Sequence, residues 1–320
     1  MSRVKLNMDD PGLDSRGPQG AFEARYLAFL ETIPHLRPRL HRYCARMTGS
    51  VMDGEDIVQE TLFQAYRKLE TFDDTRDLTP WLFRIAHNRC IDLLRRRKVR
   101  QQAEAVAAQP DAYLPPDPAD AVPPQSIEHL VLALAPRERA CVLLKDVFEY
   151  SLEEIASLVG STVGAVKAAL NRGRSKLAAL PRQPSAQRAR KPESSHLLHL
   201  YVERFNQRDW DGIRELATAD ARIHVADRYT GPLATAPYFA RYERLATPWQ
   251  LATGTVDGQP VIITLRQHKD QWTPHSLIRV DIEDGRIIRV VDYLHCPWVM
   301  EAVVSATVDP FNVAPTHPIR

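Results

Sequence analysis

The fold of the middle of this 320-residue chain is decided by the stretch Ser151-Leu152-Glu153-Glu154-Ile155-Ala156-Ser157-Leu158-Val159-Gly160-Ser161-Thr162-Val163-Gly164-Ala165-Val166. Ser151 and Glu154 have the spacing of a capping box, in which each side chain satisfies a free backbone amide at a helix start. Gly160 suits a turn that needs a positive φ, and Ala156 is small enough for two helices to cross closely. The spacing predicts a helix-turn-helix over 152–171, whose second helix continues to about 180.

The second helix of this motif is basic. From Val163 to Lys191 the chain has eight basic residues and no acidic one. In a DNA-binding helix-turn-helix the second helix lies in the major groove, with its first residues at base edges and basic residues at phosphates. An ordinary helical hairpin with a solvated basic face is the alternative. The side chains expected on the exposed face are Lys167, Asn171, Arg172, Arg174 and Lys176.

A further helical region extends over about 22–100, with apolar residues at steps of three and four. Helices are expected over about 55–69 and 79–97, joined by the polar loop 71–77. Between Arg84 and Arg100 there are seven basic residues and one acid, and Arg84, His87 and Asn88 recur at helical spacing, so they are expected to share a face. Such a helix suits a nucleic-acid strand whose bases have left the stack. A solvated arginine-rich helix end is the alternative.

An acidic cluster opens the helix expected at 55–69. Asp53, Glu55, Asp56 and Glu60 follow one another closely there. The helix dipole explains some of this charge. Because acidic residues do not help DNA binding, a protein partner is the functional interpretation.

From His196 onward the pattern changes to short helices followed by alternating strands. Helices are expected over about 196–207, 209–217 and 235–245, and strands over 221–229, 249–256, 260–268, 275–283 and 286–295. Asp257-Gly258 and Asp284-Gly285 stand between apolar runs, which is the strongest short signal for a hairpin. The pattern predicts an α+β domain with a curved antiparallel sheet.

One carboxylate of this domain is expected on an apolar face. By alternation along 286–295, Ile288, Val290 and Asp292 share one face, where burial would raise the pKa of Asp292. A structural Asp292 paired with Arg279 or Arg289, a regulatory role for the domain, and catalysis all stay open. The candidate pocket residues are Tyr201, Asp227, Trp249 and Asp292, with His224 as a further one.

Length and composition limit the number of domains and the class of protein. A chain of 320 residues fits two or three domains. A run of about 18 apolar residues is absent, which excludes a membrane span, and the polar first 20 residues are expected to be a disordered arm rather than a signal peptide. The four cysteines match neither a disulfide framework nor a zinc spacing, and they fit a reduced cytoplasm. No metal site is expected.

Shifts in composition divide the chain. We expect a disordered arm at 1–20, a helical domain at 21–100, a linker rich in Ala, Pro and Asp at 101–125, and a second helical domain at 126–181. A basic linker at 182–195, the α+β domain at 196–305 and a tail at 306–320 complete the chain.

Three separated motifs resemble the extracytoplasmic-function (ECF) sigma factors of RNA polymerase. The run Asp53-Gly54-Glu55-Asp56-Ile57-Val58-Gln59-Glu60-Thr61 is similar to their core-binding helix in region 2, and the run from Trp81 to Arg96 is similar to their −10 element helix. The run Leu134-Ala135-Pro136-Arg137-Glu138-Arg139 and the helix-turn-helix resemble region 4, which reads the −35 element. The part after 196 resembles the SnoaL-like (NTF2-like) domain of some of these factors. The resemblance implies two all-α sigma domains followed by an α+β NTF2-like cone.

The resemblance also implies roles. The chain would be a promoter-specificity subunit rather than an enzyme, without a cofactor, and its partners would be promoter DNA and the β′ clamp and β flap of core polymerase. A small molecule in the C-terminal cone is a further candidate partner. Core binding is expected from Asp53, Asp56, Ile57, Gln59 and Glu60. Contacts to the −10 element are expected from Phe72, Asp73, Trp81, Arg84, Asn88, Arg95 and Arg96, and contacts to the −35 element from Thr162, Lys167, Asn171, Arg172 and Arg174.

Two other functions stay open. A ligand-responsive helix-turn-helix regulator explains 126–180 and the cone, but it leaves the acidic helix and the Trp81 to Arg97 block unexplained. A SnoaL-like isomerase or cyclase fused to a DNA-binding module is the other. If the chain is a sigma factor, the C-terminal domain is expected to regulate it in cis by packing on both sigma domains.

Overall fold

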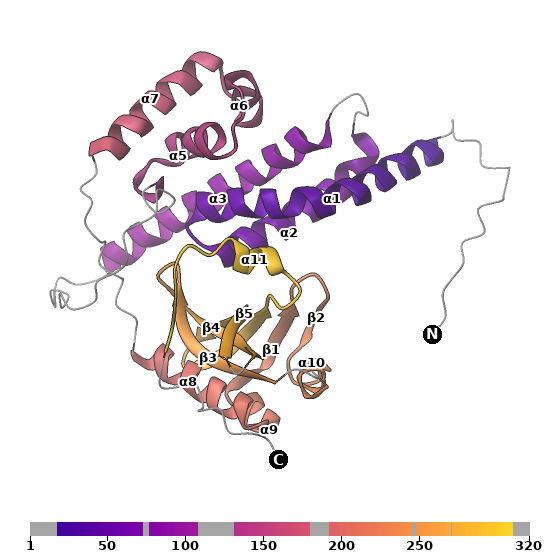
Figure 1. The fold of residues 1–320 in the computed structure, drawn as a ribbon, viewed down its shortest axis with the longest axis vertical. Coiled ribbons are helices and arrows are strands. Elements are labelled where there is room, and N and C mark those ends of the chain that lie inside the picture. The colour runs from indigo at the N-terminus through magenta and orange to yellow at the C-terminus, as the bar shows by residue number, and fades with distance from the viewer. Residues whose placement is uncertain are drawn as a thin grey trace.

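The computed structural model describes residues 18–72, 77–107, 131–179, 192–244, 248–269 and 271–309. Figure 1 shows a bundle of long helices with a small group of helices on one side and a sheet domain on the other. We call these helical domain 1 (18–107), helical domain 2 (131–179) and the C-terminal domain (192–309). The expected fold class, two all-α domains followed by an α+β domain, is confirmed. Within the described residues, a helix with the length and hydrophobicity of a membrane span is not found.

Helical domain 1 consists of α1 (Pro18–Thr48), α2 (Val51–Lys68), the short 3-10 helix η1 (Leu69–Thr71) and α3 (Leu78–Ala107). The side chain of Ser50 caps α2 by accepting a hydrogen bond from the amide of Asp53. Gly54 lets α2 approach α1 closely, since a Cβ at this position would lie 2.7 Å from the backbone nitrogen of Ala45. The acidic start of α2 is therefore fixed firmly against α1.

Helical domain 2 consists of η2 (Val131–Ala133), α5 (Pro136–Val142), the π-helical turn η3 (Leu143–Val147), α6 (Leu152–Leu158) and α7 (Val163–Ala179). The predicted helix-turn-helix is α6 and α7. Its capping box between Ser151 and Glu154 is present, and Gly160 in the turn has a φ of +60°. These features confirm the local prediction.

The two helical domains share one hydrophobic core. Tyr43 of α1 packs edge to face on Phe148, at 5.9 Å between ring centroids. Arg139 of α5 is buried and donates hydrogen bonds to the carbonyl oxygens of Met47 and Val131. Helical domain 2 is thus held against the end of α1.

The C-terminal domain begins with α8 (Pro192–Asn206) and α9 (Trp210–Glu215) and places α10 (Tyr238–Glu243) and α11 (Pro297–Glu301) between strands. Its strands are β1 (Ala217–Val225), β2 (Tyr229–Pro232), β3 (Trp249–Val256), β4 (Gln259–His268), β5 (Gln271–Glu283), β6 (Arg286–Asp292) and β7 (Ala306–Val308). They form one sheet in the order β2-β1-β6-β5-β4-β3-β7. Asp257-Gly258 and Asp284-Gly285 have positive φ at both positions and join β3 to β4 and β5 to β6, so both predicted hairpins are confirmed.

The sheet differs from the prediction in three places. It is mixed rather than wholly antiparallel, because β1 pairs in parallel with β6. The strand expected at 221–229 ends at Val225, and β2 begins after a turn in which Asp227 has a φ of +66°. A register shift between β5 and β6 puts Ile287, rather than the predicted Ile288, into the core beside Val290.

The two faces of the sheet are covered by different partners. One face packs against α8, α9 and α10 and includes Ile223, Ile278 and Val290. The opposite face packs against α11 and against Val51 and Met52 of helical domain 1. The C-terminal domain therefore uses one face of its sheet for its own core and the other to lie against α1 and α2 (Figure 1).

Candidate functional site

The predicted −35 residues lie on one exposed surface. Thr162, Lys167, Asn171, Arg172 and Arg174 are all exposed, at the start and along the outer side of α7. The hydroxyl of Thr162 also accepts a hydrogen bond from the amide of Ala165, at 3.2 Å, so it caps the helix. The surface has the shape and charge of a recognition helix.

Several cations of this surface are held by acids of the same domain. Glu138 of α5 accepts from Arg172 at 3.1 Å and from Lys176 at 2.7 Å, and Arg174 pairs with Asp146. These hydrogen bonds and the charges of Lys176 and Arg172 hold the pKa of Glu138 below its usual value. Lys167 and Asn171 lie closer to the start of α7, where a recognition helix meets base edges.

The predicted −10 residues lie along α3 and at the end of η1. Arg84, Asn88, Arg95 and Arg96 are exposed on α3. Phe72 is buried and packs on the half-buried Trp81, at 4.5 Å between ring centroids. Asp73 lies outside the described residues.

His87 does not share the exposed face with Arg84 and Asn88, so that prediction is wrong. An α-helix has about 3.6 residues per turn, so Asn88 lies slightly past Arg84 around the helix and His87 lies slightly before it. His87 and Asn88 are therefore about 100° apart, and His87 falls on the side of the core. Its ring lies 2.9 Å from the hydroxyl of Tyr43 through Nδ1. Burial, with a smaller contribution from Arg137, lowers the pKa of His87 to about 4.

Three of the five predicted core-binding residues of α2 contact the C-terminal domain: Asp53, Asp56 and Gln59. Asp53 and Asp56 are 20% and 33% exposed, Ile57 is buried and Gln59 is half-buried, while Glu60 is exposed and pairs with Arg89 of α3 at 3.0 Å. Arg279 of β5 approaches both aspartates, with 2.9 Å to Asp56 and 3.8 Å to Asp53. Burial raises the pKa of Asp56 even though Arg279 opposes this effect.

Glu55 is the centre of this contact. It is fully buried and accepts hydrogen bonds from Arg37 of α1 at 2.5 Å and from the indole nitrogen of Trp298 of α11 at 2.7 Å. Arg37 also stacks on Trp298, 4.6 Å from the ring centroid, and pairs with Asp227 at 2.9 Å. Burial alone would lower the pKa of Arg37, but Glu55 and Asp227 raise it. These four residues link α1, α2, α11 and the β1–β2 turn.

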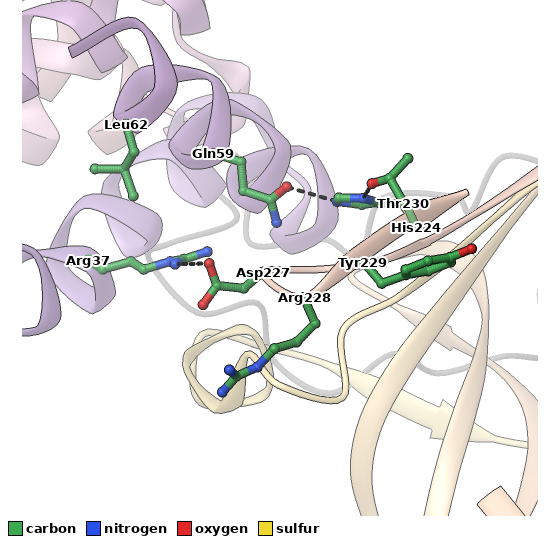
Figure 2. A pocket seen from close by; sticks show the side chains of 8 residues that line it. All are labelled: Arg37, Gln59, Leu62, His224, Asp227, Arg228, Tyr229 and Thr230. Atoms are coloured by element: carbon green, nitrogen blue, oxygen red, sulfur yellow. Dashed lines mark hydrogen bonds and ion pairs between the residues drawn. The ribbon is translucent and has the colours of Figure 1, made fainter. Parts of the chain in front are cut away.

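A cavity of about 380 Å³ lies beside this cluster, between α1, α2 and the β1–β2 hairpin, and we call it the interface cavity (Figure 2). His224 of β1 spans its edge. The Nε2 atom of His224 donates to Gln59 at 2.9 Å, and its Nδ1 atom accepts from the hydroxyl of Thr230 at 2.6 Å. Burial and the charge of Arg289 lower the pKa of His224, which favours this neutral form. The lining residues are Arg37, Gln59, Leu62, His224, Asp227, Arg228, Tyr229 and Thr230.

The four predicted pocket residues are not brought together. Tyr201, Trp249 and Asp292 lie in the same core, on the α8 to α10 side of the sheet. Asp227 instead faces Arg37 at the interface. Trp249 packs on Tyr242 and donates to its carbonyl oxygen at 2.9 Å, so it supports Tyr242 within this core.

Asp292 has hydroxyl partners rather than the predicted arginine. It accepts from Tyr238 at 2.9 Å, from Tyr242 at 2.6 Å and from the amide of Leu294 at 2.8 Å. The pairing with Arg279 or Arg289, one of the alternatives from the sequence, is wrong: within the described residues neither arginine pairs with Asp292, and Arg279 instead binds Asp56 of α2. Burial raises the pKa of Asp292, although these hydrogen bonds oppose the rise.

A second cavity, of about 340 Å³, lies beside Asp292, and we call it the cone cavity. Its walls come from β1, α10 and the end of β6. The lining residues are Val225, Tyr229, Pro237, Tyr238, Ala240, Arg241, Tyr242, Arg244, Asp292 and Leu294.

The interface residues were largely missed from the sequence. Arg37, Arg279 and Trp298 stand far apart in the chain and belong to no motif. Only the acidic cluster of α2 indicated that a partner was needed there, and that partner includes another part of the same chain.

Comparisons with known proteins agree with this geometry. Residues 33–100 match Sigma-70 region 2, and residues 125–177 match Sigma-70 region 4. The ECF RNA polymerase sigma factor SigG of Mycobacterium tuberculosis is 32% identical, over 88% of this chain and 85% of its own length. SigW of Bacillus subtilis, also an ECF sigma factor, is 32% identical over 47% of this chain and 87% of its own length.

A solved structure covers most of the chain as well. The crystal structure of the extracytoplasmic function sigma factor SigJ of M. tuberculosis matches 82% of this chain and 95% of its own, with 16% identity and a TM-score of 0.33. The match to SigG extends through the C-terminal domain, so the relationship is not restricted to the helical domains. This chain belongs to the ECF sigma factors, which bind core RNA polymerase and promoter DNA.

Proposed function

We propose that α7 reads the −35 element through Thr162, Lys167, Asn171, Arg172 and Arg174, and that α3 holds the melted −10 strand. The exposure of Arg84, Asn88, Arg95 and Arg96 on α3 supports the second assignment. Phe72 and Trp81 would contribute the aromatic surface for a displaced base. Helical domain 2 would contact the β flap of the polymerase, and α2 would contact the β′ clamp.

We infer that the C-terminal domain covers the polymerase-binding side of α2 and so keeps this sigma factor inactive until the contact opens. The observation that carries this proposal is the pairing of Arg279 with Asp53 and Asp56, two residues expected to face the polymerase. Because the same carboxylates cannot face Arg279 and the polymerase at once, the two contacts exclude each other. The contacts support packing on helical domain 1, whereas helical domain 2 packs on another side of that domain (Figure 1).

The cone cavity is the proposed site of a small molecule. We propose no catalytic step there. The carboxylate of Asp292 already accepts three hydrogen bonds, and both tyrosines that donate to it belong to the core. A binding role fits this satisfied network better than proton transfer.

The masking proposal predicts that Arg279→Ala increases affinity for core polymerase. Removing the guanidinium frees Asp56 and ends the longer contact with Asp53, which stays paired with Arg97 of α3. We expect about tenfold tighter binding, which corresponds to about 1.4 kcal/mol. The measurement is a titration of the labelled full-length protein with core polymerase, followed by transcription from a cognate promoter.

Arg222→Ala is the matched control, because Arg222 is exposed on β1 of the same sheet. This variant should bind core polymerase like the wild type. Unchanged or weaker binding by Arg279→Ala would contradict the masking role.

A further inference from the structure

We propose that the cone cavity binds a small, mainly apolar molecule that carries an anionic group, and that occupancy of this cavity is linked to the contact between the C-terminal domain and α2. The link rests on the proposed masking of α2, whereas the binding site itself does not.

The walls of the cone cavity are apolar and pre-formed. Val225, Pro237 and Leu294 contribute aliphatic surface, and Tyr238 and Tyr242 contribute their rings. Both tyrosines are almost fully buried and make edge-to-face contacts with Phe205, so the wall does not have to be ordered by the ligand. The volume of about 340 Å³ is in the range of small-molecule sites, about 300 to 1,000 Å³.

The charge at the mouth of the cavity selects an anion. Arg241 lies on α10, Arg244 is the residue that follows its end, and both are exposed and line the cavity. Of the acids nearby, Glu243 accepts from Trp210 at 2.5 Å and Asp227 is paired with Arg37. Among the residues that the structure describes, no carboxylate pairs with Arg241 or Arg244. Guanidinium groups bind carboxylates and similar anions through two parallel hydrogen bonds.

The polar group inside the cavity already has hydrogen-bond partners. Asp292 uses both oxygens to accept from Tyr238, Tyr242 and Leu294. The inner part of the cavity therefore suits an apolar body, and the anionic group belongs at the arginines.

The same hairpin forms a wall of the cone cavity and the contact with α2. Val225 and Tyr229 are cross-strand partners that line the cone cavity. Their neighbours His224 and Thr230 are also cross-strand partners, and they face Gln59 of α2 (Figure 2). Because side chains alternate between the two faces of a strand, this hairpin presents one pair to the cone cavity and the next pair to α2, and it is the element through which we propose the two are linked.

Tyr229 belongs to both cavities. It lines the cone cavity and the interface cavity, and it follows the turn in which Asp227 holds Arg37. A ligand that shifts Tyr229 therefore shifts the residues that hold α1 and α2.

Two fluorescent probes test the site on the full-length protein. 1-Anilinonaphthalene-8-sulfonate carries an apolar body and an anionic group, and N-phenyl-1-naphthylamine has the same body without the sulfonate. We expect saturable binding of the anionic probe. Arg241→Ala with Arg244→Ala should weaken it about tenfold and change binding of the neutral probe less than about twofold.

Three further variants locate the probe. Ala240→Trp fills the cavity and should abolish binding of both probes while the melting temperature stays within a few degrees of the wild type. Phe63→Ser removes an exposed apolar side chain of α2 and should leave both probes unaffected, as should Arg222→Ala. Equal effects of the arginine changes on both probes, or persistent binding to a folded Ala240→Trp variant, would overturn the site.

The link to α2 has its own readout. Arg279→Ala and Trp298→Ala loosen the contact at residues remote from the cone cavity, so each should change the dissociation constant of the anionic probe at least about threefold. An unchanged constant would overturn the link. If Arg279→Ala also fails to bind core polymerase more tightly, the masking proposal fails. The probe-binding site is then still tested independently by the Arg241, Arg244 and Ala240 variants.

Discussion

At the scale of single residues, burial decides which charged and polar groups are available for recognition. Glu55 and His87 both lie within motifs that resemble functional helices, yet both are buried and have internal partners. Asp56 and Asn88, one residue further along in each case, reach the surface or a partner domain. The sequence motif therefore predicts the helix correctly. The role of each side chain depends on its position around the helix, which the motif does not specify.

The buried His87 gives stability a defined dependence on pH. Its folded pKa of about 4 lies below the ordinary value of 6.5, so the unfolded chain binds more protons between these values. The contribution of neutral His87 to the free energy of unfolding is fully present above pH 6.5 and is lost as the pH falls toward 4. At pH 5 the loss is about 2 kcal/mol.

This prediction is tested by urea unfolding of the wild type and His87→Gln at pH 7 and pH 5. Between pH 7 and pH 5, the free energy of unfolding of the wild type should fall by about 2 kcal/mol more than that of the variant. Parallel losses in both proteins would show that His87 is not the group that titrates.

At the scale of elements, local patterns predicted the helices and hairpins well because each depends on residues close in sequence. The capping box, the glycine turn and the two Asp-Gly hairpins all lie where the pattern indicated. The parallel pairing of β1 with β6 could not be predicted in this way, since about 60 residues separate the strands. The bulge that exchanges Ile288 for Ile287 also depends on the partner strand.

The recognition helix α7 makes a prediction at this scale. Lys167 is exposed near its start and should contact a phosphate or base edge of the −35 element, so Lys167→Ala should weaken DNA binding and lower the salt slope by about one. The measurement is a titration of −35 DNA at several salt concentrations with the reconstituted holoenzyme.

Lys176→Ala is the comparison for that experiment, because Lys176 lies further along the same helix and is held by Glu138. Its effect should be smaller, and neither change should reduce core binding. A loss of core affinity in Lys167→Ala would count against a DNA role for this residue.

At the scale of the whole molecule, the structure is a closed arrangement of three domains. The helical domains share a core, and the C-terminal domain lies against α1 and α2. Elements at −10 and −35 are about 25 base pairs apart, or about 85 Å at 3.4 Å per base pair, whereas the longest helix, α1 with 31 residues, spans about 46 Å. If α3 and α7 bind these elements as proposed, we expect the two helical domains to separate so that both elements can be read.

This separation can be followed by energy transfer between dyes on Gln101→Cys of α3 and Ser175→Cys of α7, two exposed positions outside the proposed contacts. The native cysteines are all buried, which favours selective labelling. Transfer efficiency should fall when core polymerase and promoter DNA are added. Constant efficiency in a transcribing complex would show that the shared core does not open.

The order of helical parts followed by an α+β part was readable from the sequence, but the closed arrangement was not. Contacts such as Arg279 with Asp56 join residues more than 200 positions apart, and each is an ordinary charged surface residue until the domains meet. Composition and hydrophobic periodicity do not predict such a pairing. Only the acidic cluster at the start of α2 indicated that this helix contacts another protein surface.

The contact between Arg279 and α2 has a consequence for how cells can control this factor. If the C-terminal domain masks α2 as proposed, the inhibitor belongs to the same polypeptide as its target and is present at one copy per target, at an effective concentration set by the connection between them. Raising expression cannot outnumber such an inhibitor, and no second gene has to be kept in balance with it. The response to a signal therefore depends on how many molecules open, and stays proportional at low and high gene dosage.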